Sequence, residues 1–438
     1  MRHRLTTRIA PLIFLAGSLF GVSAALAQND CEELISSLPD NYVRGHVSVP
    51  ENWDEPQGEK IEVFYYGRLR PGSGNPVVAV FNGGPSSDSH GLYRKLSSDP
   101  RSAGVDFVFM DQRGTGCSTP YPPGESRETA RRLTGYTSRA IVHDAEAVRR
   151  KLLGRNGKWR IFGQSYGGLI VHRYLAVAPG SLEAAYSHGY AVMTDQVEWM
   201  KERILSQDRV ADDYFRGYPQ DRQLLETIRA RIPPDKCFTD EGSTICGPAM
   251  IDAIRHPLGF RNSWEDMHWW IDTLSQQNEY SDNMMNGFLL VYATDFTRSK
   301  LPSSVINKVE INKGASDVAE CAEASRRLRA AGDDPDLWPV NECRIIAAVK
   351  NERLDSLLDS VTGIDPLTLD AVRTSLAENP SLKLYLYAGR KDTFVPVDTF
   401  REEVSVLGGL VEYTAFPDSG HEGYSTEGKV WDDLLRRP

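Results

Sequence analysis

The sequence has no C-x-x-C pair among its six cysteines, no internal repeat and no tract of low complexity. The missing C-x-x-C spacing argues against a zinc site or a dithiol redox centre. After residue 27, no uninterrupted apolar run reaches the roughly 18 residues that a membrane-spanning helix needs. Basic residues are outnumbered, with 50 lysines and arginines against 60 aspartates and glutamates. This acidic balance disfavours nucleic-acid binding, so we expect no nucleic-acid partner.

The first 27 residues have the three parts of a secretory signal peptide, namely a basic start, an apolar stretch and a small-residue end. We predict cleavage between Ala27 and Gln28, which leaves 47 basic and 60 acidic residues. The alternative is a retained membrane anchor, but the proline and glycines in the apolar run favour cleavage. Cys31 is not preceded by a lipoprotein box. We therefore expect an exported protein, periplasmic or secreted, with no membrane attachment after cleavage.

The six cysteines are consistent with an oxidising compartment. Proximity along the chain suggests the pairs Cys237–Cys246 and Cys321–Cys343, which leaves Cys31 for Cys117. The alternative is that some of these cysteines are buried free thiols. Disulfide bonds are thus predicted, and their pairing is a hypothesis.

Short apolar runs dominate two parts of the chain. The early segments 42–50 and 61–69 alternate as antiparallel strands do, whereas the later runs are continuous and are typical of strands buried on both faces of a parallel sheet. These later runs are Val77–Phe81, Val105–Asp111, Trp159–Gly163, Leu382–Gly389 and Val411–Pro417. Amphipathic helical patterns lie between several of them, for example at 141–153, and another lies near the end. Alternating strands and helices predict an α/β fold with a mostly parallel sheet.

This alternation stops between residues 191 and 379 and resumes at 380. We predict an α/β core at 28–190 and 380–438, interrupted by a mainly helical cap at 191–379. A separate downstream domain is the alternative, but the buried-strand pattern that returns after residue 380 argues against it.

The pentapeptide Gly163–Gly167 has the form G-x-S-x-G, follows a buried strand and precedes an apolar helix. That context is required for a nucleophile elbow, a sharp turn that lifts the serine hydroxyl above the sheet. Side chains at the flanking glycines would collide in such a turn. Ser165 is therefore the candidate nucleophile, although the pattern alone also fits an ordinary turn serine.

A serine nucleophile needs a base and an acid that orients the base. Asp392 comes just after a predicted strand and His421 just after the next one, so both should lie at the carboxyl edge of the sheet. Asp398 and Asp418 are the competing acids. We expect the other histidines after the signal peptide to be structural residues, and His90 and His188, in loops at strand ends, are candidates to lie beside the site. These histidines are His46, His90, His143, His172, His188, His256 and His268.

Acyl transfer also needs donors for the oxyanion. The backbone N–H of Tyr166, directly after the nucleophile, is one candidate. The glycine-rich stretch after Val77–Phe81 is the other, with the N–H of Gly84 preferred and Gly83 second.

Five motifs in order, "NGGPSS", "DQRGTGCS", "GQSYGG", "GRKDTFVP" and "GHEGY", resemble the proline iminopeptidase and tripeptidyl aminopeptidase group of α/β-hydrolases. This resemblance implies an α/β-hydrolase fold with a large helical cap, and a serine peptidase that removes residues from free peptide N-termini. It also implies a structural role for "DQRGTGCS", with Arg113 bracing the glycine loop. The chain departs from the group at Asn82, usually histidine, and at Ser86, usually glycine; neither change removes a backbone donor.

The resemblance also implies acids in the cap that bind the substrate amine. Here the corresponding stretch is "DQVEWMKER", and the candidates are Asp195, Glu198, Glu202 and Asp295. Each also fits as part of a solvated helix face.

We therefore expect an exported serine hydrolase of the aminopeptidase type, in which Ser165, His421 and Asp392 form the triad. The expected partner is a small peptide or ester substrate, and no metal or cofactor is implied. One alternative is an esterase or lactonase on the same triad. The remote alternative, a non-catalytic binding protein on a hydrolase scaffold, is disfavoured because no triad member is missing.

Overall fold

A computed structural model of the chain describes residues 24–240, 243–276, 278, 281, 301–311, 317–362, 365–422 and 428–436. The chain divides into two units. The first ends at Asp40, and its described part contains helix α2 (Ala24–Ser37). The second runs from Asn41 to the C-terminus and contains every other element named below. Most of the predicted signal peptide, residues 1–23, lies outside the described residues.

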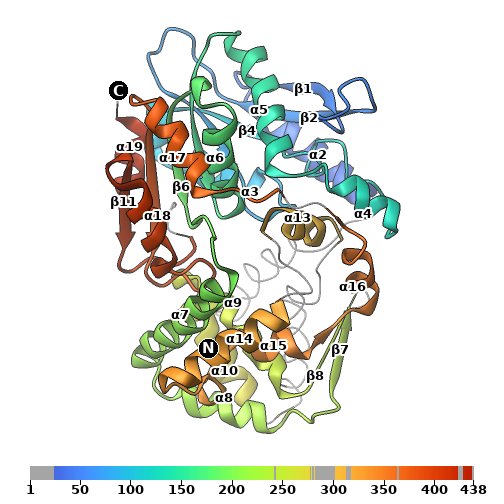
Figure 1. The fold of residues 1–438 in the computed structure, drawn as a ribbon, viewed down its shortest axis with the longest axis vertical. Helices are drawn as coiled ribbons and strands as arrows, with labels where there is room; N and C mark the ends of the chain where they lie inside the picture. The colour runs from blue at the N-terminus through green and yellow to red at the C-terminus, as the bar shows by residue number, and fades with distance from the viewer. Residues whose placement is uncertain are drawn as a thin grey trace, which may run out of the picture. The chain divides into compact units, whose positions relative to one another are not determined.

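Within the described residues, the second unit is built on an eight-stranded sheet with the order β1-β2-β4-β3-β5-β6-β10-β11 (Figure 1). Strand β2 runs antiparallel to both neighbours, and all pairings from β4 to β11 are parallel. The strands are β1 (Val43–Pro50), β2 (Lys60–Gly67), β3 (Val77–Phe81), β4 (Asp106–Met110), β5 (Trp159–Gln164), β6 (Leu182–His188), β10 (Lys383–Gly389) and β11 (Val411–Phe416). The predicted mostly parallel sheet is confirmed; the sequence pattern does not single out β6.

Both faces of the sheet are covered, as β4 illustrates. Because side chains alternate along a strand, Val108 and Met110 join the apolar cluster that includes α5 (Ser138–Leu153) and α6 (Tyr166–Val177). Phe107 and Phe109 point to the other face, where their rings contact Trp431 of α19 (Gly428–Leu435) and Tyr93 of α3 (His90–Ser98). A strand buried on both sides reads as a continuous apolar run, which is why the sequence pattern revealed it.

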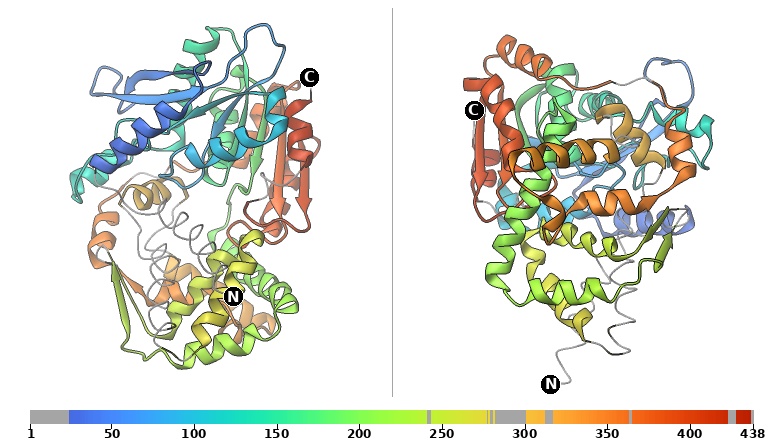
Figure 2. Two further views of the ribbon diagram at one scale, coloured as in Figure 1. Left: turned by 180° about the vertical axis from the view of Figure 1, so that it is seen from behind. Right: turned by 60° about the horizontal axis from the view of Figure 1, so that its bottom comes forward.

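The segment between β6 and β10 is mainly helical in its described part. It also carries a small sheet of β7 (Cys237–Asp240), β8 (Ser243–Cys246) and β9 (Val349–Lys350). Its main helices are α7 (Gln196–Gly217), α8 (Asp221–Ala230), α9 (Arg255–Leu258), α10 (Trp264–Ser275), α13 (Leu301–Ile311), α14 (Asp317–Ala331), α15 (Glu342–Ala348), α16 (Glu352–Leu358) and α17 (Leu369–Glu378). Helices α7, α8, α10, α14 and α15 gather in the lower half of Figure 1, and Figure 2 shows the same grouping from other sides.

Not all of this segment is remote from the core. Helices α13, α16 and α17 contribute buried apolar side chains to the cluster that also contains the strands and α6. The predicted core and cap boundaries stay predictions, but part of the stretch assigned to the cap packs as core. The chain then returns through β10, α18 (Phe400–Leu407) and β11 to α19.

Two of the predicted disulfides, Cys237–Cys246 and Cys321–Cys343, are present. Cys31 and Cys117 are also disulfide-bonded. Their predicted pairing would join the two units, and it stays a prediction.

Across the described residues, no helix is both long and apolar enough to cross a membrane.

Candidate active site

The site lies where the order of strands along the chain reverses direction. From β3 the chain moves to β4 on one side, and it later returns to β5 on the other side. Strands β3 and β5 are parallel neighbours, so the loops that follow them emerge together at the carboxyl edge of the sheet. Open α/β sheets bind ligands at such a reversal point. The glycine-rich stretch follows β3, and Ser165 follows β5.

Ser165 forms the turn between β5 and α6 and has a strained backbone. Its φ is 57° and its ψ is −121°, a combination that residues other than glycine rarely adopt. Its N–H donates to the carbonyl of His188 at the end of the neighbouring strand, at 2.8 Å. The flanking glycines leave no space for a side chain, because a Cβ at Gly163 would lie 2.0 Å from the Gly167 oxygen and one at Gly167 would lie 2.2 Å from the Phe81 oxygen. The predicted strand–turn–helix context is therefore present.

Asp392 and His421 meet at the same edge of the sheet. Asp392 follows β10 and His421 follows β11, and β10 pairs in parallel with β11. The Nδ1 of His421 lies 2.6 Å from Oδ2 of Asp392. The other oxygen of Asp392 accepts hydrogen bonds from the N–H groups of Phe394 (2.8 Å) and Val395 (2.9 Å). Asp392 is fully buried, and a carboxylate only accepts hydrogen bonds. In this contact Nδ1 of His421 is therefore the donor, and Nε2 is left for another partner.

A hydrogen bond from a side chain and a close approach of the backbone link this pair to the serine turn. Gln164, directly before Ser165, donates from its side chain to the carbonyl of His421 at 2.8 Å. Gly189, just after β6, has φ of +62°, and a Cβ there would lie 3.1 Å from His421 Cε1 and 3.5 Å from Asp392 Oδ2. A residue with a side chain at this position would press on His421 and Asp392. The sequence does not predict this role for Gly189, because no motif marks it.

His188, the neighbour of Gly189, is fully buried next to the pair. Burial, reinforced by the charge of His421, lowers its pKa to about 3. His188 is therefore neutral near neutral pH and carries no positive charge beside His421.

The glycine stretch after β3 lies directly against Ser165. A Cβ on Gly83 would sit 3.2 Å from the Cβ of Ser165. Gly84 has φ of +118°, which favours glycine there. Tyr121 donates to Ser86, two residues further on, at 3.3 Å. The stretch is thus placed where an oxyanion donor is needed, and Gly84 with Tyr166 stays our prediction for the two donors.

The role predicted for Arg113 is wrong. Its guanidinium binds Asp144 of α5 through two bonds of 2.7 and 2.8 Å and also contacts the carbonyls of Pro50, Glu51 and Gly135. Arg113 thus braces β1 against α5. Its long side chain reaches past its own loop to these partners and not to the glycine stretch. Another residue of the same motif, Gln112, supports the glycine stretch by donating to the Asn82 carbonyl at 2.9 Å.

Residues from the segment between β6 and β10 contact the Asp392–His421 pair, and sequence patterns do not indicate this. The His421 N–H donates to the Gly259 carbonyl at 2.9 Å, and the ring of Phe260 lies edge-on to the imidazole with 5.8 Å between centroids. Ser206 of α7 donates to the Asp392 carbonyl at 2.9 Å. The inserted segment thus helps to hold both loops that carry the pair.

The predicted amine-binding acids have other partners or lie outside the described residues. Asp195 caps α7 by accepting hydrogen bonds from Val197 (2.9 Å) and Glu198 (3.0 Å) N–H groups. Glu198 pairs with Lys201. Glu202 is half-buried, and burial with the nearby charge of Asp398 raises its pKa. Asp295 lies outside the described residues. None of these contacts places an acid at Ser165, so the amine-binding role stays a prediction.

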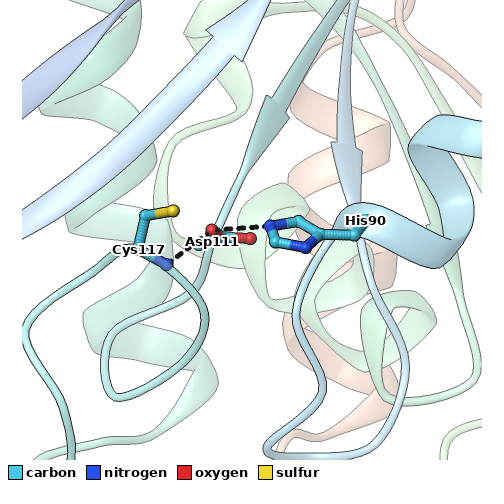
Figure 3. Close-up of side chains that lie close together, drawn as sticks. All are labelled: His90, Asp111 and Cys117. Carbon is cyan, nitrogen blue, oxygen red and sulfur yellow. Dashed lines mark hydrogen bonds and ion pairs between the residues drawn. The ribbon is translucent and has the colours of Figure 1, made fainter. Parts of the chain in front are cut away.

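One group of side chains in the described part of the chain has the spacing of metal ligands: His90, Asp111 and Cys117 (Figure 3). The Cys117 sulfur is held in a disulfide and so cannot act as a thiolate. Asp111 instead accepts a 2.9 Å hydrogen bond from the Cys117 N–H and lies 3.5 Å from His90. Burial opposes protonation of His90, but the carboxylate of Asp111 outweighs it and raises the His90 pKa. This group therefore acts as a brace between two loops.

A family model described as the alpha/beta hydrolase fold matches residues 76–227, a range that includes Ser165 and ends before Asp392. A proline iminopeptidase of Aeromonas sobria is 37% identical over 158 residues, covering 32% of this chain and 36% of that protein. A proline iminopeptidase of Aspergillus aculeatus is 25% identical over 202 residues, covering 43% of each. The chain thus aligns with less than half the length of these curated relatives.

Two solved structures align with most of this chain at low sequence identity. The proline iminopeptidase of Mycobacterium smegmatis is 15% identical with a TM-score of 0.41, covering 89% of this chain and 97% of that one. An esterase of Thermogutta terrifontis is 14% identical with a TM-score of 0.43, covering 89% and 96%.

Proposed function

Since this chain has the α/β-hydrolase fold and is similar in part to proline iminopeptidases, we propose that it is an exported serine hydrolase of the aminopeptidase type. The observation that carries the proposal is the 2.6 Å contact between Asp392 and His421, at the sheet edge where Ser165 has its strained turn. Acyl transfer on this fold requires nucleophile, acid and base in this chain order, here Ser165, Asp392 and His421. The disulfide bonds support export, because they persist in oxidising compartments.

In the proposed reaction, Ser165 Oγ attacks the substrate carbonyl carbon and its proton moves to Nε2 of His421. The N–H groups of Tyr166 and Gly84 hold the negative oxygen of the tetrahedral intermediate. Collapse breaks the bond to the leaving amine, which takes the proton from His421. Water then attacks the acyl-enzyme, gives its proton to His421, and the acid is released as that proton returns to Ser165. Asp392 keeps the imidazole oriented and stabilises its positive form throughout.

The aminopeptidase assignment rests on the relatives' names and on the resemblance of the five motifs. A free substrate amine needs a counter-charge near the nucleophile, and Glu202 is the remaining candidate on α7 within the described residues. An esterase or lactonase would use the same triad without that requirement.

The test compares aminoacyl and short peptidyl nitroanilides, with free and with blocked N-termini, against a nitrophenyl ester. We expect the free-amine substrates to be preferred and Ser165→Ala to lose about 10³-fold or more in kcat. Preference for blocked peptides, or for esters alone, would contradict the aminopeptidase assignment. Unchanged turnover by Ser165→Ala would contradict the mechanism itself.

A further inference from the structure

Tyr166 combines two features that the proposed mechanism uses only in part. Its N–H is the predicted oxyanion donor, because first-turn N–H groups of a helix lack partners within the helix. Its side chain is 7% exposed, and its hydroxyl donates to Oε2 of Glu310 at 2.6 Å. Glu310 lies on α13, far along the chain, and sequence patterns do not mark it.

Glu310 is itself held rigidly. Its Oε1 accepts from the N–H of Ser138 at 2.8 Å and also from the Ser138 hydroxyl. Ser138 is the first residue of α5, so the carboxylate lies at the positive end of that helix, where negative charge is stabilised. Both residues are buried, with 3% of Glu310 and none of Ser138 exposed. The hydroxyl of Tyr166 is therefore tied to a fixed point between two helices.

The rigid position of the Glu310 carboxylate matters because the backbone of Ser165, next to Tyr166, is strained. Ser165 is held at φ of 57°, and such a conformation persists only where the surroundings over-determine it. An oxyanion donor contributes fully only when it is oriented before the charge develops. Loosening Tyr166 would let the turn relax and would turn its N–H away from the developing charge.

We propose that Glu310 is a positioning residue for the oxyanion site, acting through the hydroxyl of Tyr166. This inference rests on the proposed function, since it presupposes that Ser165 is the nucleophile. It also assigns a task to α13, which lies in the stretch predicted as the cap: this helix orients the donor next to the nucleophile.

The chain offers a matched control on the same helix. Tyr174 of α6 also donates to a buried glutamate, Glu146, at 2.5 Å, but it lies two turns further from Ser165. Tyr166→Phe and Tyr174→Phe thus each remove one buried Tyr–Glu hydrogen bond, and Tyr174→Phe also removes the 3.2 Å hydrogen bond from the Trp159 indole N–H. Tyr174→Phe should therefore lower thermal stability at least as much as Tyr166→Phe, which separates stability from positioning.

Two measurements report on the oxyanion site. The first is kcat and KM for a nitrophenyl ester. The second is the inhibition constant of phenylboronic acid, whose boron bonds to a serine oxygen and becomes a tetrahedral anion. We expect Tyr166→Phe to lower kcat about 10-fold, to leave KM nearly unchanged and to weaken the boronate by a similar factor. Tyr174→Phe should keep both quantities within about twofold.

Glu310→Gln provides the second variant if Tyr166→Phe fails to fold. It removes the charge that holds the phenol while keeping the volume, and it should lower kcat and boronate affinity together. Wild-type kcat and boronate affinity in a folded Tyr166→Phe or Glu310→Gln would overturn the inference, as would equal losses in Tyr174→Phe. Ser165→Ala separates the two proposals: if it stays active, the proposed function fails, and if it is inactive while Tyr166→Phe is normal, only this inference fails.

Discussion

At the scale of single residues, glycines decide how closely the loops of the site approach one another. Gly259 is the clearest case, since its carbonyl accepts from His421 and a Cβ there would lie 2.4 Å from Thr393 Oγ1 and 2.7 Å from the Phe394 ring. Phe394 in turn donates its N–H to Asp392. A methyl group at Gly259 therefore pushes on the loop that carries the acid.

We predict that Gly259→Ala lowers kcat and destabilises the fold by about 2 kcal/mol, as overpacking in a close-packed region does. Gly217, on α7 in the same inserted segment, serves as the control, because a Cβ added there would meet no atom within 4 Å. Thermal melts and ester kinetics on both variants check this. Equal melting temperatures and equal kcat values for the two alanine variants would show that the Gly259 contact is not tight.

At the scale of elements, a buried pair ties α6, the helix that follows Ser165, to α18. His172 of α6 lies 2.7 Å from the Gly168 carbonyl through Nδ1 and 2.7 Å from Glu403 through Nε2. Glu403 also accepts from the Val192 N–H at 3.0 Å. Since a carbonyl only accepts, Nδ1 carries a proton, and the carboxylate favours a second proton on Nε2. Burial disfavours the positively charged form of His172, but the negative charge of Glu403 outweighs this effect. The pKa of His172 is therefore raised above 6.5.

A histidine whose pKa is raised on folding stabilises the fold at low pH and loses that contribution as pH rises. We predict that His172→Gln lowers the free energy of unfolding by about 3 kcal/mol below pH 6.5. This cost should shrink as pH rises through the folded pKa of His172. Urea unfolding of wild type and variant between pH 5.5 and 9 measures it.

His143 of α5 is the control, because its contribution to stability should depend on pH in the opposite direction. Burial lowers its pKa, so its contribution is present above the unfolded pKa and is lost as pH falls. The difference in free energy of unfolding between wild type and His143→Gln should therefore shrink toward low pH. A His172 difference that grows with pH would contradict the charged pair.

At the scale of the whole molecule, the disulfides differ in accessibility. Cys237 is exposed, whereas Cys321 and Cys343 are 4% and 9% exposed in a helical cluster with Trp199 and Met200. Thiol–disulfide exchange requires access of the attacking thiolate to sulfur.

We predict that dithiothreitol under native conditions reduces Cys237–Cys246 first and leaves Cys321–Cys343 intact. Alkylation of new thiols followed by peptide mapping gives the order. Simultaneous loss of both bonds would indicate that the inserted segment opens as one unit, which would contradict the protection that the helical cluster gives to Cys321 and Cys343.

The sequence by itself determined the parallel sheet and its fold class, since strands buried on both faces produce apolar runs that need no tertiary information. It also indicated Ser165, Asp392 and His421, because each follows a buried strand and parallel strands end at one edge. Only the tertiary structure decided what surrounds them. Gly189, Gly259 and Glu310 carry no local signal, because their roles depend on close approach or on a partner more than a hundred residues away. The partner of Arg113, Asp144 on α5, was likewise decided only by how the chain folds.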